Sequence, residues 1–360
     1  MPPDTRTFPG LSLSPLGPGT TRRDGESRFV EPPEFAIGDI REVLNWGVET
    51  AARLPWPGEG STAKLWGFLA TVAAVDVGAA RIVEPHLDAL GILRQAGDPD
   101  LSRIHTTSAS SWGVFAAEAS GVTLEATEDP AGWTLTGTKP WCSLADVLSH
   151  ALVTAHVGDG ERRLFAINLA DAGVSVHEGP WTARGLQQVK STPITLAAVR
   201  AIPIGPANWY VKRPGFHWGG MAVAACWWGG SVGVARTLFA RLGESGHPLD
   251  PITAMHAGAV DVQLASAQAL LREAAAAVDS GEVVGPELAR LVKRVRSHVC
   301  AVSEAVLTSV AHALGPAPLV SDENHARRVA DLDLYIRQHH AEKDDASLGK
   351  LLHEAGVSPW

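Results

Sequence analysis

The stretch Gly132-Trp-Thr-Leu-Thr-Gly-Thr-Lys-Pro-Trp-Cys-Ser-Leu-Ala145 decides the fold of this chain. Trp133 and Leu135 alternate with threonines, and this period of two predicts a half-buried strand. Gly137-Thr138 predicts the turn that follows the strand. Pro140 has no backbone N–H to donate, so we expect the chain to leave the sheet at that point as an edge.

Two side chains after the proline, Trp141 and Ser143, carry the functional signal of this stretch. They stand two residues apart on backbone that is predicted to be extended, so we expect them to point the same way. An aromatic ring beside a small hydroxyl suits a flat ligand with polar edges. The two residues equally fit a tryptophan anchored in the sheet core and an exposed loop hydroxyl.

The same stretch resembles a motif of the acyl-CoA dehydrogenase family, whose central β-domain carries a Gly-aromatic-x-Leu-x-Gly-x-Lys-x-Trp-Ile-Thr/Ser pattern that contacts FAD. The matching residues are Gly132, Trp133, Leu135, Gly137, Lys139, Trp141, Cys142 and Ser143. Upstream, Trp112-Gly-Val-Phe-Ala-Ala-Glu-Ala-Ser120 stands where the family has Tyr-Cys-x-Thr-Glu-Pro-x-x-Gly-Ser. The resemblance extends over roughly residues 40 to 342 and marks the chain as a divergent member.

The order of the predicted elements supports an α+β fold like that of acyl-CoA dehydrogenases. After a flexible tail over residues 1–36, residues 37–110 have helical spacing and predict an N-terminal α-domain. Residues 111–213 change to a period of two and predict a central antiparallel β-domain. Its candidate strands are Val114–Ala117, Val122–Thr127, Trp133–Thr136, Ala151–His156, Leu164–Leu169, Val174–His177 and Pro193–Val199.

Residues 214–360 return to helical spacing and predict a C-terminal four-helix bundle. Two helices are expected at Gly219–Leu242 and Asn324–His340, and two apolar stripes predict the core faces of the others. One stripe is Ile252, Met255, Ala259 and Val262; the other is Leu288, Leu291, Val292, Val295, Val299, Val302, Val306 and Val310. In the N-terminal part, helices are expected at Lys64–Ala80 and Ile82–Leu93.

Composition restricts the partners. The formal net charge of -9 argues against nucleic acid and anionic membranes, because both require a basic face. The chain's 3 cysteines are widely spaced and form no CxxC, so we expect neither a disulfide framework nor a metal site, and a reducing cytoplasm as the location. Small molecules remain as ligands. The pair Trp227-Trp228 and the alanine-rich helices offer more apolar surface than a small bundle hides, so we expect a homo- or hetero-oligomer. Both tryptophans fit the intrachain core nearly as well.

The resemblance also indicates where the chemistry is expected. In the family, a glutamate of the C-terminal bundle removes the α-proton of an acyl thioester while flavin accepts the β-hydride. The aligned position holds His339, and a second base position used by some members falls near Ala224, so neither holds a carboxylate. His339 and His340 are the catalytic candidates, because imidazole titrates near neutrality. A polar pair near a helix end is the equal alternative.

His86, in the segment Glu84-Pro-His-Leu-Asp88, is the third catalytic candidate. Its position resembles that of histidines that flavin-dependent hydroxylases of the same fold place near the flavin. An ordinary histidine near the start of a helix fits the pattern slightly better.

The cofactor motif is eroded at three places. Ala117-Glu118-Ala119 replaces Thr-Glu-Pro, Glu244-Ser-Gly-His-Pro248 replaces an Arg-x-x-Phe-Gly segment that binds pyrophosphate, and His312-Ala-Leu-Gly-Pro316 replaces a Gln-x-x-Gly-Gly loop. Each change removes a hydrogen bond of about 1–3 kcal/mol, so weak dinucleotide affinity is expected. By resemblance, the residues that contact FAD are Trp112, Ala117, Glu118, Trp141, Cys142, Ser143, His312 and Gly315.

The resemblance therefore implies an FAD-dependent oxidoreductase that carries out α,β-dehydrogenation of an acyl thioester or a related acyl substrate. Two alternatives stay open. One is a reduced-flavin monooxygenase of the same fold that uses His86 with His339 or His340. The other is a non-catalytic subunit of a hetero-oligomeric acyl-CoA dehydrogenase, which the missing glutamate and arginine would explain.

Overall fold

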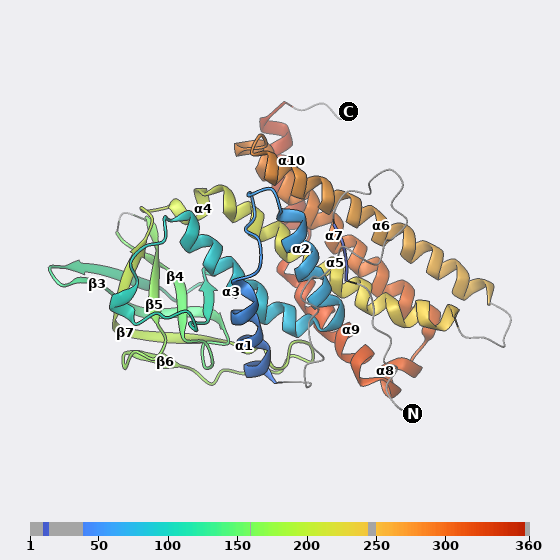
Figure 1. Ribbon diagram of the computed structural model, residues 1–360, viewed down its shortest axis with the longest axis horizontal. Coiled ribbons are helices and arrows are strands. Elements are labelled where there is room, and N and C mark those ends of the chain that lie inside the picture. The colour runs from blue at the N-terminus through green and yellow to red at the C-terminus, as the bar shows by residue number, and fades with distance from the viewer. Residues whose placement is uncertain (1–9, 14–38, 159, 244–249, 357–360) are drawn as a thin grey trace.

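The computed structural model describes residues 10–13, 39–158, 160–243 and 250–356. Figure 1 shows a β-sheet at one end of an elongated molecule and a bundle of long helices at the other, with helix α3 between them. The first helices are α1 (Ile40–Ala51), α2 (Thr62–Val75) and α3 (Val77–Gln95), followed by the short helix η1 (Ser102–Ile104). Most of the predicted N-terminal tail lies outside the described residues, but Leu13 is buried and Leu11 N donates to Thr71 Oγ1 of α2.

The break between α2 and α3 falls earlier than the sequence predicted. Asp76 ends α2 and is the N-cap of α3, where its side chain accepts a hydrogen bond from Ala79 N at 2.9 Å. Aspartate is among the best N-cap residues, and this preference outweighs the continuous apolar spacing across the break. Pro85 lies inside α3 without ending it.

The strands are β1 (Trp112–Phe115), β2 (Leu124–Asp129), β3 (Gly132–Ser143), β4 (His150–His156), β5 (Arg162–Asn168), β6 (Val174–Val176) and β7 (Ser191–Ile204). Each predicted strand overlaps one of them. In the described part, β2, β3, β7, β5 and β4 pair in a ring and form a small closed barrel, while β1 and β6 pair with β4 and β7.

The sequence predicted an antiparallel sheet, and the structure differs from this prediction at two strand pairs. The pairs β1–β4 and β2–β4 are parallel, the second through the single Glu125–His156 pairing. The β2–β3 hairpin reverses the chain and the next connection reverses it again, so β4 runs in the direction of β2. Closing the ring therefore requires a parallel contact.

The predicted turn at Gly137-Thr138 and the predicted exit at Pro140 are wrong, because β3 pairs with β7 as far as Ser143. The pairing register shifts between Leu135 and Gly137 and again between Lys139 and Cys142. Gly137 has a φ of +128°, and a Cβ there would lie 2.3 Å from the Thr123 carbonyl oxygen. Pro140 falls in the second irregularity, where a bulge leaves residues unpaired and its missing N–H costs no ladder bond.

The C-terminal part contains four long helices, as predicted, and several short ones. They are α4 (Trp209–Lys212), α5 (Pro214–Leu242), α6 (Pro251–Ser280), α7 (Gly285–Leu314), α8 (Ala317–Ser321), α9 (Glu323–Tyr335), η2 (Ile336–Gln338) and α10 (Glu342–Glu354). The helix expected at Asn324–His340 therefore ends five residues early. His339 and His340 lie between η2 and α10 and not on a helix.

Helix α5 is the centre of the bundle and contacts α2, α6, α7 and α9. A Cβ on Gly229 would lie 2.1 Å from the Ala70 carbonyl oxygen, so α2 and α5 approach closely only because this residue is glycine. Trp227 and Trp228 are 0% and 3% exposed. They belong to the intrachain core, the alternative that the sequence left open, so this pair gives no reason to expect an oligomer.

The two apolar stripes of the bundle have opposite outcomes. The α7 stripe is buried or half-buried along its length, as predicted. The α6 stripe is wrong as a core face, because Ile252, Met255 and Val262 are 58%, 55% and 66% exposed. The α6 face that packs inward carries smaller residues, among them Ala267, Ala274 and Ala275, which allow the helices to approach. Among the described residues, no helix is both long and apolar enough to cross a bilayer.

Candidate active site

A cavity of about 490 Å³ lies where the sheet meets the bundle. Helix α3 contributes charged side chains, the end of β1 contributes small apolar ones, and α5 and α7 form the opposite wall. The turn between η2 and α10 supplies His339 and His340. Of the residues that the sequence singled out, the cavity brings together Ala117, His339 and His340.

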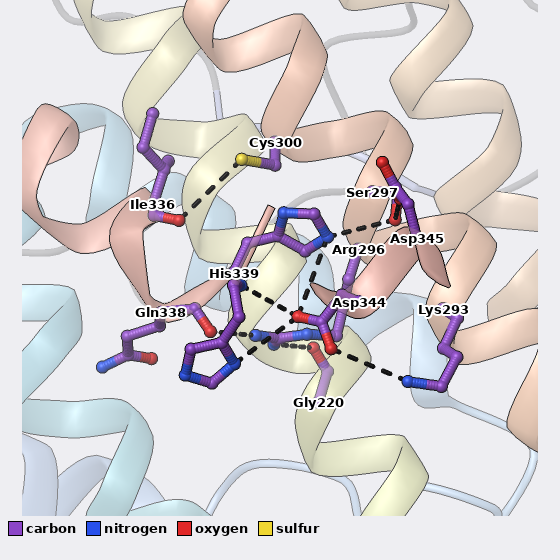
Figure 2. A network of polar contacts seen from close by, with 11 residues as sticks. Gly220, Lys293, Arg296, Ser297, Cys300, Ile336, Gln338, His339, Asp344 and Asp345 are labelled. Carbon is purple, nitrogen blue, oxygen red and sulfur yellow. Dashed lines mark hydrogen bonds and ion pairs between the residues drawn. The ribbon is translucent and has the colours of Figure 1, made fainter. Parts of the chain in front are cut away.

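His339 is buried and held from one side (Figure 2). Its Nε2 lies 3.0 Å from Ser297 Oγ, and the same hydroxyl donates to Asp345 Oδ1 at 2.7 Å. Since an ionised carboxylate only accepts and a serine hydroxyl has one proton, Ser297 must accept from His339 Nε2–H. This assignment leaves a lone pair on Nδ1 of the neutral ring. Burial lowers the pKa of His339, so the neutral form is favoured.

His340 is exposed, unlike its neighbour, and is tied to the first turn of α10. Its backbone N–H donates to Asp344 Oδ2 at 2.9 Å, and its ring Nδ1 lies 3.6 Å from the same oxygen. Asp344 also lies 3.7 Å from Lys293 Nζ of α7 (Figure 2). The aspartate therefore fixes the turn that presents both histidines to the cavity.

Glu84 is the carboxylic acid that sequence reasoning missed. It lines the cavity from α3 and is 7% exposed. Burial and the nearby charge of Asp88 raise the pKa of Glu84 to about 7, against the opposing charges of Arg81 and Arg296. A group that titrates near neutrality in a cavity can both accept and donate a proton. The available signal was a Glu84/Asp88 pair spaced i, i+4 on one helix.

Four cations line the same cavity as this acid. They are Arg81, Arg213, Lys293 and Arg296. Arg296 donates to the carbonyl oxygens of Gly220 and Gln338 at 3.0 Å each (Figure 2). It thereby connects α7 to α5 and to the turn that holds the histidines. Arginines on helix faces had no sequence signal, because packing decides which face meets the cavity.

Trp141 and Ser143 do not line the cavity. Trp141 is 59% exposed and has a φ of +58° in the second β3 irregularity, so the extended backbone predicted between the two residues is wrong. Ser143 Oγ lies 2.7 Å from Ser191 Oγ and accepts from Arg81 Nη2 at 3.2 Å. Arg81 thus connects this hydroxyl pair to the cavity.

Three other residues of the predicted cofactor set have partners within the protein. Trp112 is 3% exposed and its ring centroid lies 5.0 Å from that of His150. Glu118 accepts from the buried ammonium of Lys139 at 2.8 Å. Cys142 is fully buried, and burial raises the pKa of its thiol to about 12. The Trp112 and Cys142 side chains are therefore packed in the core.

His312 and Gly315 lie at the C-terminal end of α7, whereas the cavity residues of that helix end at Arg296. At 1.5 Å per residue, the sixteen residues between Arg296 and His312 correspond to about 24 Å. Within one chain, neither residue reaches the cavity.

His86 lies in the interior. It is 1% exposed, does not line the cavity, and neither ring nitrogen has a partner among the described residues. Burial lowers the pKa of His86 to about 4, so the ring is neutral at physiological pH. The structure does not bring it together with His339 and His340.

No protein-family model matches the chain, and no curated protein matches it in sequence. Solved structures do match. KijD3 in complex with FMN and dTDP-3-amino-2,3,6-trideoxy-4-keto-3-methyl-D-glucose is 15% identical, with a TM-score of 0.72 over 98% of both chains.

Two further structures are similar over most of their length. FMN-bound TdsC from Paenibacillus sp. A11-2, a dibenzothiophene monooxygenase, is 18% identical, with a TM-score of 0.72 over 89% of this chain and 90% of that one. Glutaryl-CoA dehydrogenase from Mycobacterium smegmatis is 16% identical, with a TM-score of 0.73 over 90% of each chain. The chain has the fold of the acyl-CoA dehydrogenases, as the sequence motif predicted.

Proposed function

From this fold and this cavity, we propose that the chain is a flavin-dependent oxidoreductase that acts on a small molecule bound beside His339, with the reaction of a reduced-flavin monooxygenase. The observation that carries the proposal is the base position itself: neutral His339 lines the cavity at the position where the family motif has a glutamate. Two of the similar structures contain FMN, and one of them is a monooxygenase.

The residues present fit a flavin ring beside the cavity. Trp141 offers a flat indole that is 59% exposed, a large exposure for a tryptophan next to a sheet. Two residues later, the Ser143 hydroxyl and the Arg81 guanidinium that donates to it add hydrogen-bonding groups. Flavin in this position would supply the redox chemistry, either hydride acceptance or, in its reduced form, reaction with O₂.

The protein's own groups would then handle protons and orientation. The free Nδ1 lone pair of His339 would accept a proton or a hydrogen bond, while Ser297 and Asp345 fix the ring. Cys142, Cys226 and Cys300 are free and buried, in keeping with action in a reducing cytoplasm. The replaced pyrophosphate arginine and the distance of His312 from the cavity favour FMN over FAD.

A second candidate is the α,β-dehydrogenation of an acyl substrate with FAD. Glu84 favours it, because a cavity carboxyl whose pKa is raised to about 7 can remove an α-proton. In this reaction Glu84 would replace the missing bundle glutamate, acting from α3.

A spectrum of the purified protein titrated with FMN and with FAD tests the proposal first. Retained flavin absorbance after gel filtration supports a flavoenzyme. If the protein takes up neither flavin, the proposed function is wrong and the non-catalytic subunit is the remaining alternative. The two reactions then differ in their oxygen requirement. Label from ¹⁸O₂ in the product, with reduced flavin supplied, supports the monooxygenase; anaerobic bleaching of the flavin by an acyl thioester supports the dehydrogenase.

A further inference from the structure

The charges that line the cavity do not cancel. Two of its cations have carboxylate partners: Arg213 Nη2 lies 3.8 Å from Asp88 Oδ1, and Lys293 Nζ lies 3.7 Å from Asp344 Oδ1. Among the described residues, Arg81 and Arg296 have no carboxylate oxygen within 4.0 Å. Their hydrogen-bond acceptors are neutral: a serine hydroxyl for Arg81 and two backbone carbonyls for Arg296.

Both guanidinium groups keep spare donors. A guanidinium carries five N–H groups, and these contacts use one on Arg81 and two on Arg296. Both groups act electrostatically on the Glu84 carboxyl. Asp344 and Glu84 act on Arg296 only at longer range. Both arginines are half-buried in the wall of a partly apolar cavity, so a ligand that enters the cavity can bind their spare N–H groups.

We propose that Arg81 and Arg296 form an anion-binding subsite that takes the carboxylate of the substrate, and that the substrate is a monoanionic organic acid. This inference rests on the proposed function, since it names the substrate class of the same cavity. A guanidinium binds a carboxylate through parallel N–H···O bonds, and two arginines from facing helices fix its orientation.

The charge balance favours one negative charge over two. Above about pH 7, where Glu84 is ionised, Arg81 and Arg296 leave the pocket with a net charge of about +1 after the two ion pairs are set aside. A carboxylate neutralises this charge. A phosphate dianion would face the ionised Glu84 as well. The apolar ends of the cavity, Val114 and Val223 among them, suit the hydrocarbon body of the acid.

Calorimetric titration of the full chain, before any flavin is added, tests the subsite with phenylacetate, its neutral isostere phenylacetamide, and phenyl phosphate. We expect phenylacetate to bind at least about 10-fold more tightly than phenylacetamide. Arg81→Gln and Arg296→Gln should each weaken phenylacetate binding about 10- to 100-fold and leave phenylacetamide unchanged. Arg296→Lys keeps the charge but loses the parallel N–H donors of the guanidinium. Its affinity for phenylacetate should lie between that of the unaltered protein and that of Arg296→Gln.

The control is Arg103→Gln. Arg103 is exposed on η1 and, like Arg296, donates to a backbone carbonyl, that of Ala131. The Arg103→Gln variant should bind phenylacetate with the affinity of the unaltered protein. Thermal melts identify any variant that fails to fold, and the two arginines come from different helices, so one loss leaves the other test intact.

Equal binding of phenylacetate and phenylacetamide, or no binding of any probe, would overturn the subsite. Tighter binding of phenyl phosphate would overturn the carboxylate assignment. Because these titrations contain no flavin, they separate the two proposals. Anion selectivity without flavin uptake would overturn the proposed function and keep the subsite; flavin uptake without anion selectivity would do the reverse.

Discussion

At the scale of single residues, the cavity depends on groups whose ionisation is set by their neighbours. His339 receives its orientation from Ser297, which lies 42 residues earlier in the chain and accepts its Nε2–H. Ser297 in turn donates to Asp345. These two hydrogen bonds orient the ring so that the free Nδ1 lone pair points away from the serine. The orientation requires the side chains of His339, Ser297 and Asp345 together.

His339→Gln should reduce turnover by about 10²-fold while flavin is retained, because glutamine keeps polarity and approximate size but cannot take a proton. Ser297→Ala should give a smaller loss, about 10-fold, because the ring remains and only its orientation is released. Steady-state rates, together with the flavin spectrum of each variant, measure both. His353→Gln on the exposed face of α10 is the control. Full turnover in His339→Gln would remove this histidine from the mechanism.

Glu84 makes stability depend on pH in a predictable direction. Its pKa is about 7 in the folded chain and near 4.5 in the unfolded chain, so between these values the folded state holds a proton that the unfolded state has lost. The free energy of unfolding therefore falls as pH rises through this window, by about 3 kcal/mol in total. Glu84→Gln removes the effect.

Denaturant unfolding at pH 4.5 and pH 8 measures this contribution. We expect the unfolding free energy of the unaltered protein to fall relative to that of Glu84→Gln when the pH is raised from 4.5 to 8. Glu273→Gln, an exposed position on α6, should show no such shift. Parallel pH curves for the unaltered protein and Glu84→Gln would contradict the raised pKa of Glu84.

The sequence could place part of this site and not the rest. Ala117 and the two histidines were found because a motif fixes their distance from a strand or from a helix end. Glu84, Arg81 and Arg296 were not, because each is one of several charged residues on a helix. Which of these side chains meets the cavity depends on how α3 and α7 are rotated against α5.

At the scale of elements, β3 shows how the local and the tertiary signals diverge. The alternation of Trp133 to Thr136 correctly predicted a strand, and Gly137 and Pro140 are ordinary signs of its end. The strand continues because pairing with β7 tolerates both residues inside register shifts. Short-range chemistry cannot reveal a bulge whose stabilising partner lies about 55 residues later in the chain.

Gly137→Ala should destabilise the barrel by more than about 2 kcal/mol. The new Cβ would meet the Thr123 carbonyl at 2.3 Å and would also force an alanine to a φ of +128°. Gly121→Ala separates these two effects, because Gly121 has a φ of +82° but no atom within 4 Å of its Cβ position. Its cost should be about 1 kcal/mol. Equal midpoints of unfolding for the two variants would mean that the close approach to Thr123 carries no cost.

At the scale of the whole molecule, the order helices, strands, helices could be predicted because two changes of hydrophobic period mark it. The closure of the barrel could not, since ring closure depends on pairings between strands distant in sequence. The prediction that the α6 stripe is a core face was wrong for another reason. Both faces of α6 carry apolar residues, and periodicity alone cannot distinguish the face that packs on α7 from the one that remains open.

The open face of α6 predicts self-association. Ile252, Met255, Ala259 and Val262 lie at helical spacing, and all four are exposed in the single chain. A continuous apolar stripe of this kind is rare on the surface of a monomer and typical of an interface. A second copy of the chain would bury it by pairing α6 with α6, which replaces the tryptophan pair as the reason to expect an oligomer.

Sedimentation of the unaltered protein over a wide concentration range should therefore give a mass above that of one chain, 37.9 kDa. Met255→Glu combined with Val262→Glu places two like charges in the stripe and should shift the protein to the monomer without lowering its melting temperature by more than a few degrees. Val320→Glu is the matched control, because Val320 is 85% exposed on α8 and is not part of the stripe. If the control dissociates the oligomer as fully as the double variant, the contact lies elsewhere. A monomeric mass for the unaltered protein at every concentration would show that the stripe has no partner of its own kind.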